Sequence, residues 1–184
     1  MSHLLEILRE QKQMQLKGNL YHITQIEFAY NTNHIEGSTL TEEQTRYIYE
    51  TNTIVVDDNT KGANVDDVIE MSNHFKLVDY MLDVADEKLT EDMIKEFHRI
   101  LKTGTSDERR EWFNVGEYKK LPNEVGGYET VEPQNVQTEM QKLLNEYNAK
   151  TKITIDDIID FHSNFEKIHP FQDGNRKSRK NNNV

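Results

Sequence analysis

Residues 169–180 of this 184-residue chain bring together residue types that can act as a base, an acid and an anion site. The segment reads HPFQDGNRKSRK. Pro170 prevents the apolar segment before it from continuing as a helix, so a tight turn is expected to carry Asp173, Gly174 and Asn175. Consecutive N–H groups of such a turn can point at one anion, and the basic side chains that follow can supply counter-charge. If a helix begins there, its positive end adds to the attraction.

The elements that must position this segment are mostly helical. Apolar residues at helical spacing predict helices over residues 4–17, 20–36, 41–55, 65–84, 91–102 and 133–148, and a last one capped by Thr154. Thr41 and Gln44 have the spacing of a capping box, and Asn64 is a suitable N-cap before two aspartates. Gly37 is expected to end the second helix in a left-handed conformation.

The helical period disappears between Trp112 and Pro133. Glycines and a proline interrupt this stretch, at Gly116, Pro122, Gly126 and Gly127. Such punctuation predicts a hairpin or loop. The predicted fold class is therefore all-α, a helical bundle in a single domain with one short β-hairpin.

Four histidines of the predicted helices lie among apolar residues, namely His74, His98, His162 and His169. His74 and His98 are expected to be core or boundary residues. The core-facing stripe of the last helix is expected to consist of residues three and four apart, namely Ile155, Ile158, His162, Phe165 and His169. A metal site made by His162 and His169 is not expected, because no third ligand is in view.

The composition excludes several classes of protein. Apolar residues make up 35% of the chain and charged residues 30%, and no apolar run approaches the length of about 20 residues that spans a bilayer. The first residues lack the features of a secretory signal, so a cytoplasmic location is expected. The absence of cysteine excludes disulfides and thiolate chemistry. A formal net charge of −11 argues against general nucleic-acid binding.

Residues 169–175 match seven successive positions of a known signature, His-Pro-Phe-x-Asp/Glu-Gly-Asn-Gly-Arg-x-x-Arg. The chain therefore resembles the Fic (filamentation induced by cAMP) family, and residues 161–168 are similar to that family as well. The resemblance spans roughly residues 20–180. It implies one Fic-like domain over residues 1–184, in which 169–180 form the signature loop, 113–132 form a flap and 1–40 include an inhibitory helix.

The resemblance implies a protein adenylyltransferase, which would transfer AMP from ATP to a Ser, Thr or Tyr hydroxyl of a target protein with the help of Mg²⁺. Because an imidazole titrates near neutral pH, His169 suits the role of proton acceptor. Asp173 offers the hard oxygen that Mg²⁺ prefers. The implied nucleotide-binding residues are Gly174, Asn175, Arg176 and Arg179.

The predicted hairpin resembles the Fic flap, along which an extended target segment adds a strand through main-chain hydrogen bonds. This arrangement would bring the target's hydroxyl to His169. The implied docking residues are Gly116, Glu117, Tyr118 and Lys119.

A second short pattern, Ser/Thr-x-x-x-Glu-Gly/Asn, fits residues 32–37, which read TNHIEG. It resembles the inhibitory helix of autoinhibited Fic proteins, in which the glutamate pairs with the second signature arginine and blocks the seat of the γ-phosphate. The implied inhibitory residues are Thr32, Glu36 and Gly37. Their place ahead of the signature implies the type with an N-terminal inhibitory helix.

The match to the signature ends after Asn175, because Arg176 stands where the family has glycine. Either Arg176 and Lys177 replace the Gly-Arg pair, or the glycine is missing and Arg176 and Arg179 keep the Arg-x-x-Arg spacing one residue early. The sequence then stops at Val184. We therefore hypothesise an altered or truncated Fic protein with weak or no activity, since the Cβ of arginine disfavours left-handed backbone.

Two alternatives to AMP transfer stay open. The same loop could transfer phosphate or another phosphate-containing group, because the resemblance does not fix the orientation of the nucleotide. The chain could also be a non-catalytic interaction domain that keeps the flap and has lost nucleotide binding.

Overall fold

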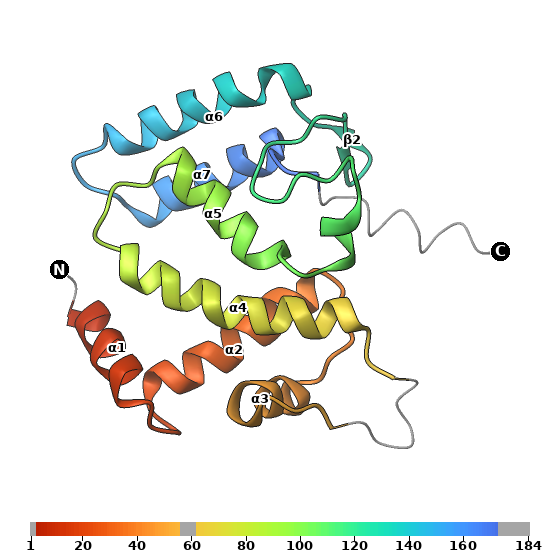
Figure 1. Cartoon of the computed structure of the whole chain (residues 1–184). Coiled ribbons are helices and arrows are strands. Elements are labelled where there is room, and N and C mark those ends of the chain that lie inside the picture. Colours follow the sequence, from red (N-terminus) through yellow and green to blue (C-terminus); the bar gives the residue numbers. More distant parts are fainter. Residues whose placement is uncertain (1–2, 56–61, 173–184) are drawn as a thin grey trace. The chain divides into compact units, whose positions relative to one another are not determined.

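A computed structural model describes residues 3–55 and 62–172 (Figure 1). These residues form seven α-helices, one 3₁₀ turn (Ser106–Arg109) and one two-stranded antiparallel hairpin. The predicted fold class, all-α with a short β-hairpin, is confirmed. The chain divides into two compact units, and each is described by itself. Unit 1 comprises Met1–Glu87 and Ile100–Ser106, and unit 2 comprises Lys88–Arg99 and Asp107–Val184. The prediction of one Fic-like domain stays a prediction.

Unit 1 contains α1 (His3–Met14), α2 (Leu20–Ile35), α3 (Glu42–Thr51) and α4 (Val65–Val84). Helix α2 packs against the other three. Its buried face contributes Ala29 to an apolar cluster whose other buried members are Leu40, Ile48, Met71 and Phe75. Helix α4 has the predicted bounds, and the N-cap Asn64 accepts a hydrogen bond from the Asp66 N–H. Among the described residues, no helix is long and apolar enough to cross a membrane.

Local backbone chemistry sets the helix ends of unit 1. Gly37 adopts φ +92°, and the N–H groups of Gly37 and Ser38 donate to carbonyls of the last turn of α2, which is the expected left-handed ending. The predicted capping box of α3 is present between Thr41 and Gln44. Two predicted ends were too late: α1 stops at Met14 and α3 at Thr51, because Gln15 and Asn52 take left-handed angles.

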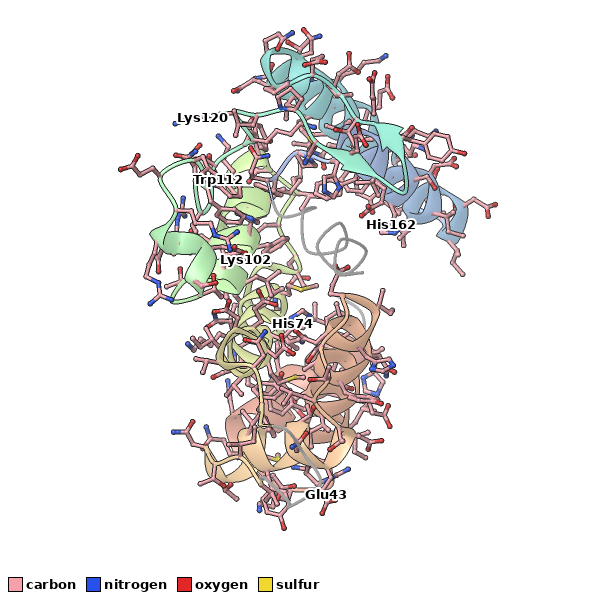
Figure 2. All side chains as sticks on the ribbon, turned by 90° about the vertical axis from the view of Figure 1, so that its right-hand side faces the viewer. Glu43, His74, Lys102, Trp112, Lys120 and His162 are labelled. Carbon is pink, nitrogen blue, oxygen red and sulfur yellow. The ribbon has the colours of Figure 1, made fainter. Side chains whose placement is uncertain are left out.

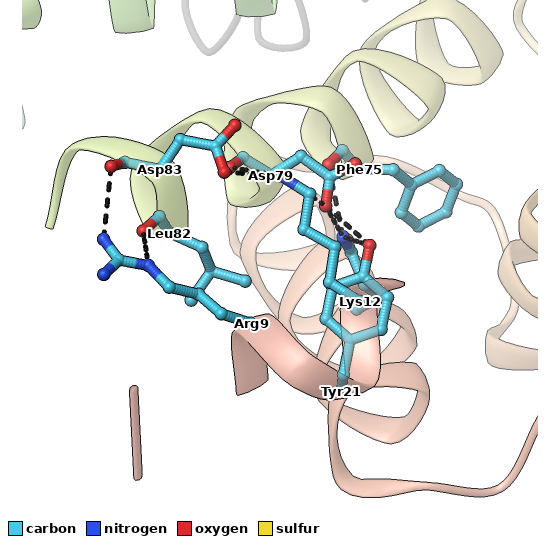
Figure 3. A network of polar contacts seen from close by, with 8 residues as sticks. Arg9, Lys12, Tyr21, Phe75, Asp79, Leu82 and Asp83 are labelled. Atoms are coloured by element: carbon cyan, nitrogen blue, oxygen red, sulfur yellow. Dashed lines mark hydrogen bonds and ion pairs between the residues drawn. The ribbon is translucent and has the colours of Figure 1, made fainter. Parts of the chain in front are cut away.

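A polar network joins three helices of unit 1 (Figure 3). The Tyr21 hydroxyl donates to Asp79 Oδ1 over 2.5 Å, and Gln25 Nε2 donates to the same carboxylate oxygen over 3.0 Å. Lys12 from α1 reaches the Asp79 carbonyl and the Asp83 carboxylate. Burial raises the pKa of the Tyr21 phenol, and the hydrogen bond to Asp79 raises it further. The phenol therefore stays protonated and donates at physiological pH.

Unit 2 contains most of α5 (Glu91–Lys102), β1 (Glu124–Val125), β2 (Tyr128–Glu129), α6 (Pro133–Asn148) and α7 (Ile155–Ile168). Helix α6 packs against α7. The buried core combines one residue of α5, the apolar face of α6 and the end of α7 with the loop beyond it: Ile94, Val136, Met140, Leu143, Leu144, Ile168 and Phe171. Helices α5 and α6 have the predicted bounds.

The hairpin pairs Glu124 with Glu129 and Val125 with Tyr128. Its two-residue turn consists of Gly126 at φ +60° and Gly127 at φ +82°. Both angles lie in the region that a tight hairpin turn requires and that glycine enters at little cost. The predicted hairpin is therefore present, and its paired residues lie beyond Gly116–Lys119.

The predicted core-facing stripe of α7 was wrong for Ile155, Ile158 and His162. His162 is exposed, and so are Ile155 and Ile158, with 76% and 54% of their surface accessible (Figure 2). The face that packs carries Phe165, which belonged to the predicted stripe, together with Phe161 and Ile168, which did not. The helix carries two apolar stripes at helical spacing, one with Ile155 and Ile158 and the other with Phe161, Phe165 and Ile168. Periodicity alone does not decide which of them faces the core. His74 and His98 are both buried, as expected.

We predict that Tyr21→Phe destabilises unit 1 by about 1–2 kcal/mol, because Asp79 loses a donor in a partly buried site. Tyr47→Phe is the matched control, since Tyr47 is 38% exposed on α3; its effect should stay within about 0.5 kcal/mol. Urea unfolding followed by circular dichroism measures both. Equal stability of the two variants would contradict a role for the Asp79 network.

Candidate active site

His169 lies directly beyond α7 and ends it. The residue adopts φ 44° and ψ 69°, a left-handed conformation, and its N–H donates to the Phe165 carbonyl over 2.8 Å. Its side chain is 18% exposed, and Nδ1 lies 3.9 Å from the Glu166 carboxylate. Nε2 is shielded from solvent and has no hydrogen-bond partner among the residues that the structure describes. An imidazole nitrogen in that state favours a partner that can share a proton with it.

An aromatic stack anchors the segment that follows His169. The Phe171 ring lies 4.1 Å from the His98 ring of α5 with an interplanar angle of 2°. Tyr118 and Phe165 approach Phe171 from other sides, at 5.7 and 6.5 Å between ring centroids. Phe171 is buried, as is the Pro170 before it. Phe171 is therefore a hydrophobic anchor for the loop.

Two polar side chains from residues 119–123 hold the backbone around His169. Lys119 donates from its N–H to the Pro170 carbonyl over 2.8 Å and from Nζ to the Ile168 carbonyl over 3.2 Å. Asn123 Nδ2 donates to the Phe171 carbonyl over 2.9 Å. The carbonyls of Ile168, Pro170 and Phe171 therefore each accept a hydrogen bond from residues 119–123.

Gln172 extends the same pairing by one residue. Its Oε1 accepts the Leu121 N–H over 3.1 Å, and its Nε2 donates to the Leu121 carbonyl over 3.3 Å. The side-chain amide thereby imitates the pairing of a neighbouring strand. The side chain of Gln172 is thus held by the backbone of Leu121.

The Lys119 ammonium is the most enclosed charge in this region. The residue is 3% exposed, and Nζ donates to Asn123 Oδ1 over 2.7 Å and to Thr130 Oγ1 over 2.6 Å, besides the Ile168 carbonyl. Burial lowers the pKa of Lys119 to about 8, against an opposing pull from Glu132. At neutral pH the group is still mostly charged, so all three of its N–H bonds can donate.

A family model described as Fic/DOC family matches residues 88–178. These residues include α5, the flap, α6, α7 and His169. The chain belongs to the Fic/DOC family.

Relatives of known name and structure agree with this Fic/DOC assignment. The protein adenylyltransferase fic-1 of Caenorhabditis elegans is 27% identical over 155 residues, which are 82% of this chain and 29% of that protein. A Fic domain-containing signaling protein of Bacteroides thetaiotaomicron has a similar structure, with a TM-score of 0.71, 27% identity and coverage of 93% of this chain and 67% of that one.

The structure of Fic-1 from C. elegans superposes with a TM-score of 0.66 at 20% identity, which shows the fold alone. It covers 92% of this chain and 52% of that one. The chain thus spans less than a third of the length of its curated relative.

The residues implied for target docking have different surroundings in this Fic/DOC chain. Gly116 is buried, donates its N–H to His98 Nδ1 over 2.9 Å, and adopts φ +76°; a Cβ here would lie 2.8 Å from Arg99 Nε, so the Arg99 side chain would have to shift. Glu117 is exposed and pairs with Lys95, whose ammonium lies 4.6 Å from the centre of the Tyr118 ring. Lys119 is buried, as described above. Docking by these residues stays a prediction.

The remaining predicted site residues fall into two groups. The implied metal ligand Asp173 and the nucleotide-binding residues Gly174, Asn175, Arg176 and Arg179 lie outside the described residues. The implied inhibitory residues Thr32, Glu36 and Gly37 lie together at the end of α2 in unit 1, with Glu36 as the exposed C-cap.

Three residues that support the loop were not identified from the sequence. Asn123 and Gln172 carry no signal beyond being polar residues near a turn and inside the signature. The role of His98 could not be read from its predicted burial, because the stack with Phe171 joins residues that are far apart in the sequence.

We predict that Lys119→Met destabilises the protein more as the pH rises from 8 to 10.5. In this window the native wild type has released the Lys119 proton while the unfolded chain still holds it, so the wild type gains stability that Met cannot gain. The difference should grow by up to about 1.4 kcal/mol per pH unit. Urea unfolding of both proteins at pH 7, 8, 9 and 10 measures it. A difference that stays constant would contradict a lowered pKa.

Proposed function

We propose that this chain transfers AMP from ATP to a Ser, Thr or Tyr hydroxyl of a target protein. The observation that carries the proposal is the state of His169, whose Nε2 is shielded, without a partner among the described residues, and held on a braced loop in a Fic/DOC domain. The name of the C. elegans relative, a protein adenylyltransferase, supports the same reaction. Because the reaction consumes ATP, the proposal agrees with the cytoplasmic location expected from the sequence.

The imidazole would act as the base of this reaction. The target hydroxyl donates its hydrogen bond to Nε2 of His169, and its oxygen attacks the α-phosphorus as the proton moves to the ring. The bond from the α-phosphorus to the bridging oxygen breaks, and pyrophosphate leaves. The Glu166 carboxylate, 3.9 Å from Nδ1, lies where it favours a proton on that nitrogen and a lone pair on Nε2.

The donor set of the loop fits Mg²⁺ and a triphosphate. The carboxylate of Asp173 is the hard oxygen that the signature segment offers a cation. A bound Mg²⁺ would neutralise charge on the phosphates. Gly174, Asn175, Arg176 and Arg179 are the proposed phosphate-binding residues.

The target segment is proposed to lie along the flap, through main-chain hydrogen bonds. In the hairpin the Tyr128 side chain is 79% exposed and Val125 36% exposed. Both can contact a partner that adds to either edge of the two strands. Of the four docking residues implied by the resemblance, Glu117 is exposed and available in the same way.

Glu36 is proposed to inhibit the reaction by pairing with the second signature arginine, Arg179. Its position supports this role, because a carboxylate at the negative end of a helix opposes the helix dipole and does not stabilise α2. The glycine ending at Gly37 fixes the direction of the chain directly after it. Because the Glu36 carboxylate does not stabilise the end of α2, its presence there is better explained by an interaction with Arg179 than by a role in capping the helix.

We predict that Glu36→Gly raises AMP incorporation into protein roughly 5- to 150-fold, the range of typical coupling between sites. Glu43→Gly, an exposed glutamate of α3, is the matched control and should change nothing (Figure 2). His169→Ala in the Glu36→Gly background should abolish transfer, whereas His162→Ala, the exposed histidine of the same helix, should not. Incorporation of ³²P from α-labelled ATP measures the rate, and mass spectrometry identifies the group.

Other results would replace the proposal. Added phosphate in place of AMP would assign the loop to phosphoryl transfer. Absence of incorporation together with absence of thermal stabilisation by ATP, even in Glu36→Gly, would identify a non-catalytic interaction domain, because a ligand stabilises the folded chain once its concentration exceeds Kd.

A further inference from the structure

The carbonyls of the two residues that flank His169, Ile168 and Pro170, are bonded to one residue. The Ile168 carbonyl accepts from Lys119 Nζ, and the Pro170 carbonyl accepts from the Lys119 N–H. His169 itself holds a left-handed backbone that residues with a Cβ seldom adopt. Such a conformation persists only where its surroundings fix it. Resting on the proposed function, we propose that Lys119 is the residue that positions the His169 base, and that it is not a contact for the target protein.

The geometry of the ammonium supports this role. A Lys side chain carries three N–H donors, and Nζ of Lys119 has three oxygen acceptors, on Ile168, Asn123 and Thr130, at 2.6–3.2 Å. Because Lys119 is only 3% exposed, water has little access to its ammonium and cannot easily compete for these donors. Each donor is thus committed, and the carbonyl before His169 is held at one place.

The same ammonium links the base to the flap. Thr130 follows β2 directly, and its hydroxyl donates to the Asn123 carbonyl over 2.9 Å across the base of the hairpin. Asn123 also donates to the Phe171 carbonyl. The flap, where the target is proposed to bind, and the loop that carries His169 therefore form one hydrogen-bonded body. Lys119 would set the distance between the incoming hydroxyl and Nε2.

The burial of the Lys119 ammonium also argues against a role in binding the target protein. A docking residue presents its side chain or its backbone donors at the surface, whereas both the N–H and Nζ of Lys119 are used inside unit 2. Its neighbour Lys120 is exposed, and its Nζ donates to Asn114 Oδ1 over 3.2 Å (Figure 2). The chain thus offers two adjacent lysines with opposite surroundings.

The test compares Lys119→Met, Lys119→Arg and the control Lys120→Met in the Glu36→Gly background. Lys119→Met should lower kcat for AMP transfer about 10- to 100-fold, because a base displaced by about 1 Å loses that much rate. Lys119→Arg keeps a charged donor and should recover part of the loss, and Lys120→Met should match the parent. A loss confined to KM for the target protein, equal in Lys119→Met and Lys120→Met, would overturn the proposal in favour of docking.

NMR signals of His169 test the positioning role of Lys119 without relying on AMP transfer, so this role and the proposed function can fail independently. The imidazole signals of His169, assigned in NMR spectra with the His169→Ala variant, should shift or broaden in Lys119→Met and stay unchanged in Lys120→Met. If Glu36→Gly transfers no AMP, the proposed function fails while this comparison still decides the positioning role. Unchanged His169 signals in Lys119→Met would overturn that role.

Thr130→Val covers the case in which Lys119→Met does not fold. The change removes one of three acceptors of the ammonium and leaves the loop residues 168–172 untouched. A shift of the His169 imidazole signals in a folded Thr130→Val would support the coupling of hairpin and base through the hydrogen bonds that Thr130 makes to Lys119 and Asn123. Unchanged signals in a folded Thr130→Val would count against the proposal in the same way as in Lys119→Met.

Discussion

The arrangement of unit 2 depends on a buried positive charge whose donors all find oxygen acceptors. An ammonium removed from water is costly unless it is fully hydrogen-bonded, and Lys119 meets that condition with partners from the hairpin and the end of α7. Because these partners are far apart in the sequence, the charge is satisfied in only one mutual arrangement of flap and loop. The lowered pKa of Lys119, about 8, reflects the cost of its burial. The need to hydrogen-bond the buried Lys119 ammonium therefore specifies how flap and loop are arranged, and it does not add to the stability of the fold.

Apolar packing around Phe171 supplies stability that the hydrogen bonds of the buried Lys119 do not. Phe171 fits between His98, Tyr118 and Phe165, and it belongs to the same buried cluster as the apolar face of α6. A ring of that size contributes a few kcal/mol when buried. Since Phe171 lies two residues after His169, the cluster also limits where the loop can go. The loop is thus fixed twice, by ring packing on one side and by donors from residues 119–123 on the other.

The sequence was sufficient to predict the features that depend on local chemistry. Helices α4, α5 and α6 have the predicted bounds because caps and apolar periodicity agree there, and Gly37 adopts the expected left-handed angle. The face of α7 was predicted wrongly, since Ile155 and Ile158 form a stripe as apolar as the one that packs. The internal role of Lys119 was beyond sequence reasoning, because it depends on a carbonyl 49 residues away.

His169, the base proposed for AMP transfer, lies at the end of α7. The carbonyls at a helix C-terminus carry partial negative charge, and the Glu166 carboxylate lies 3.9 Å from Nδ1. The Lys119 ammonium, by contrast, is shared among three oxygen acceptors. A helix end held by a satisfied lysine can thus offer a fixed base without a competing donor for its free nitrogen, within the part of the chain that the structure describes.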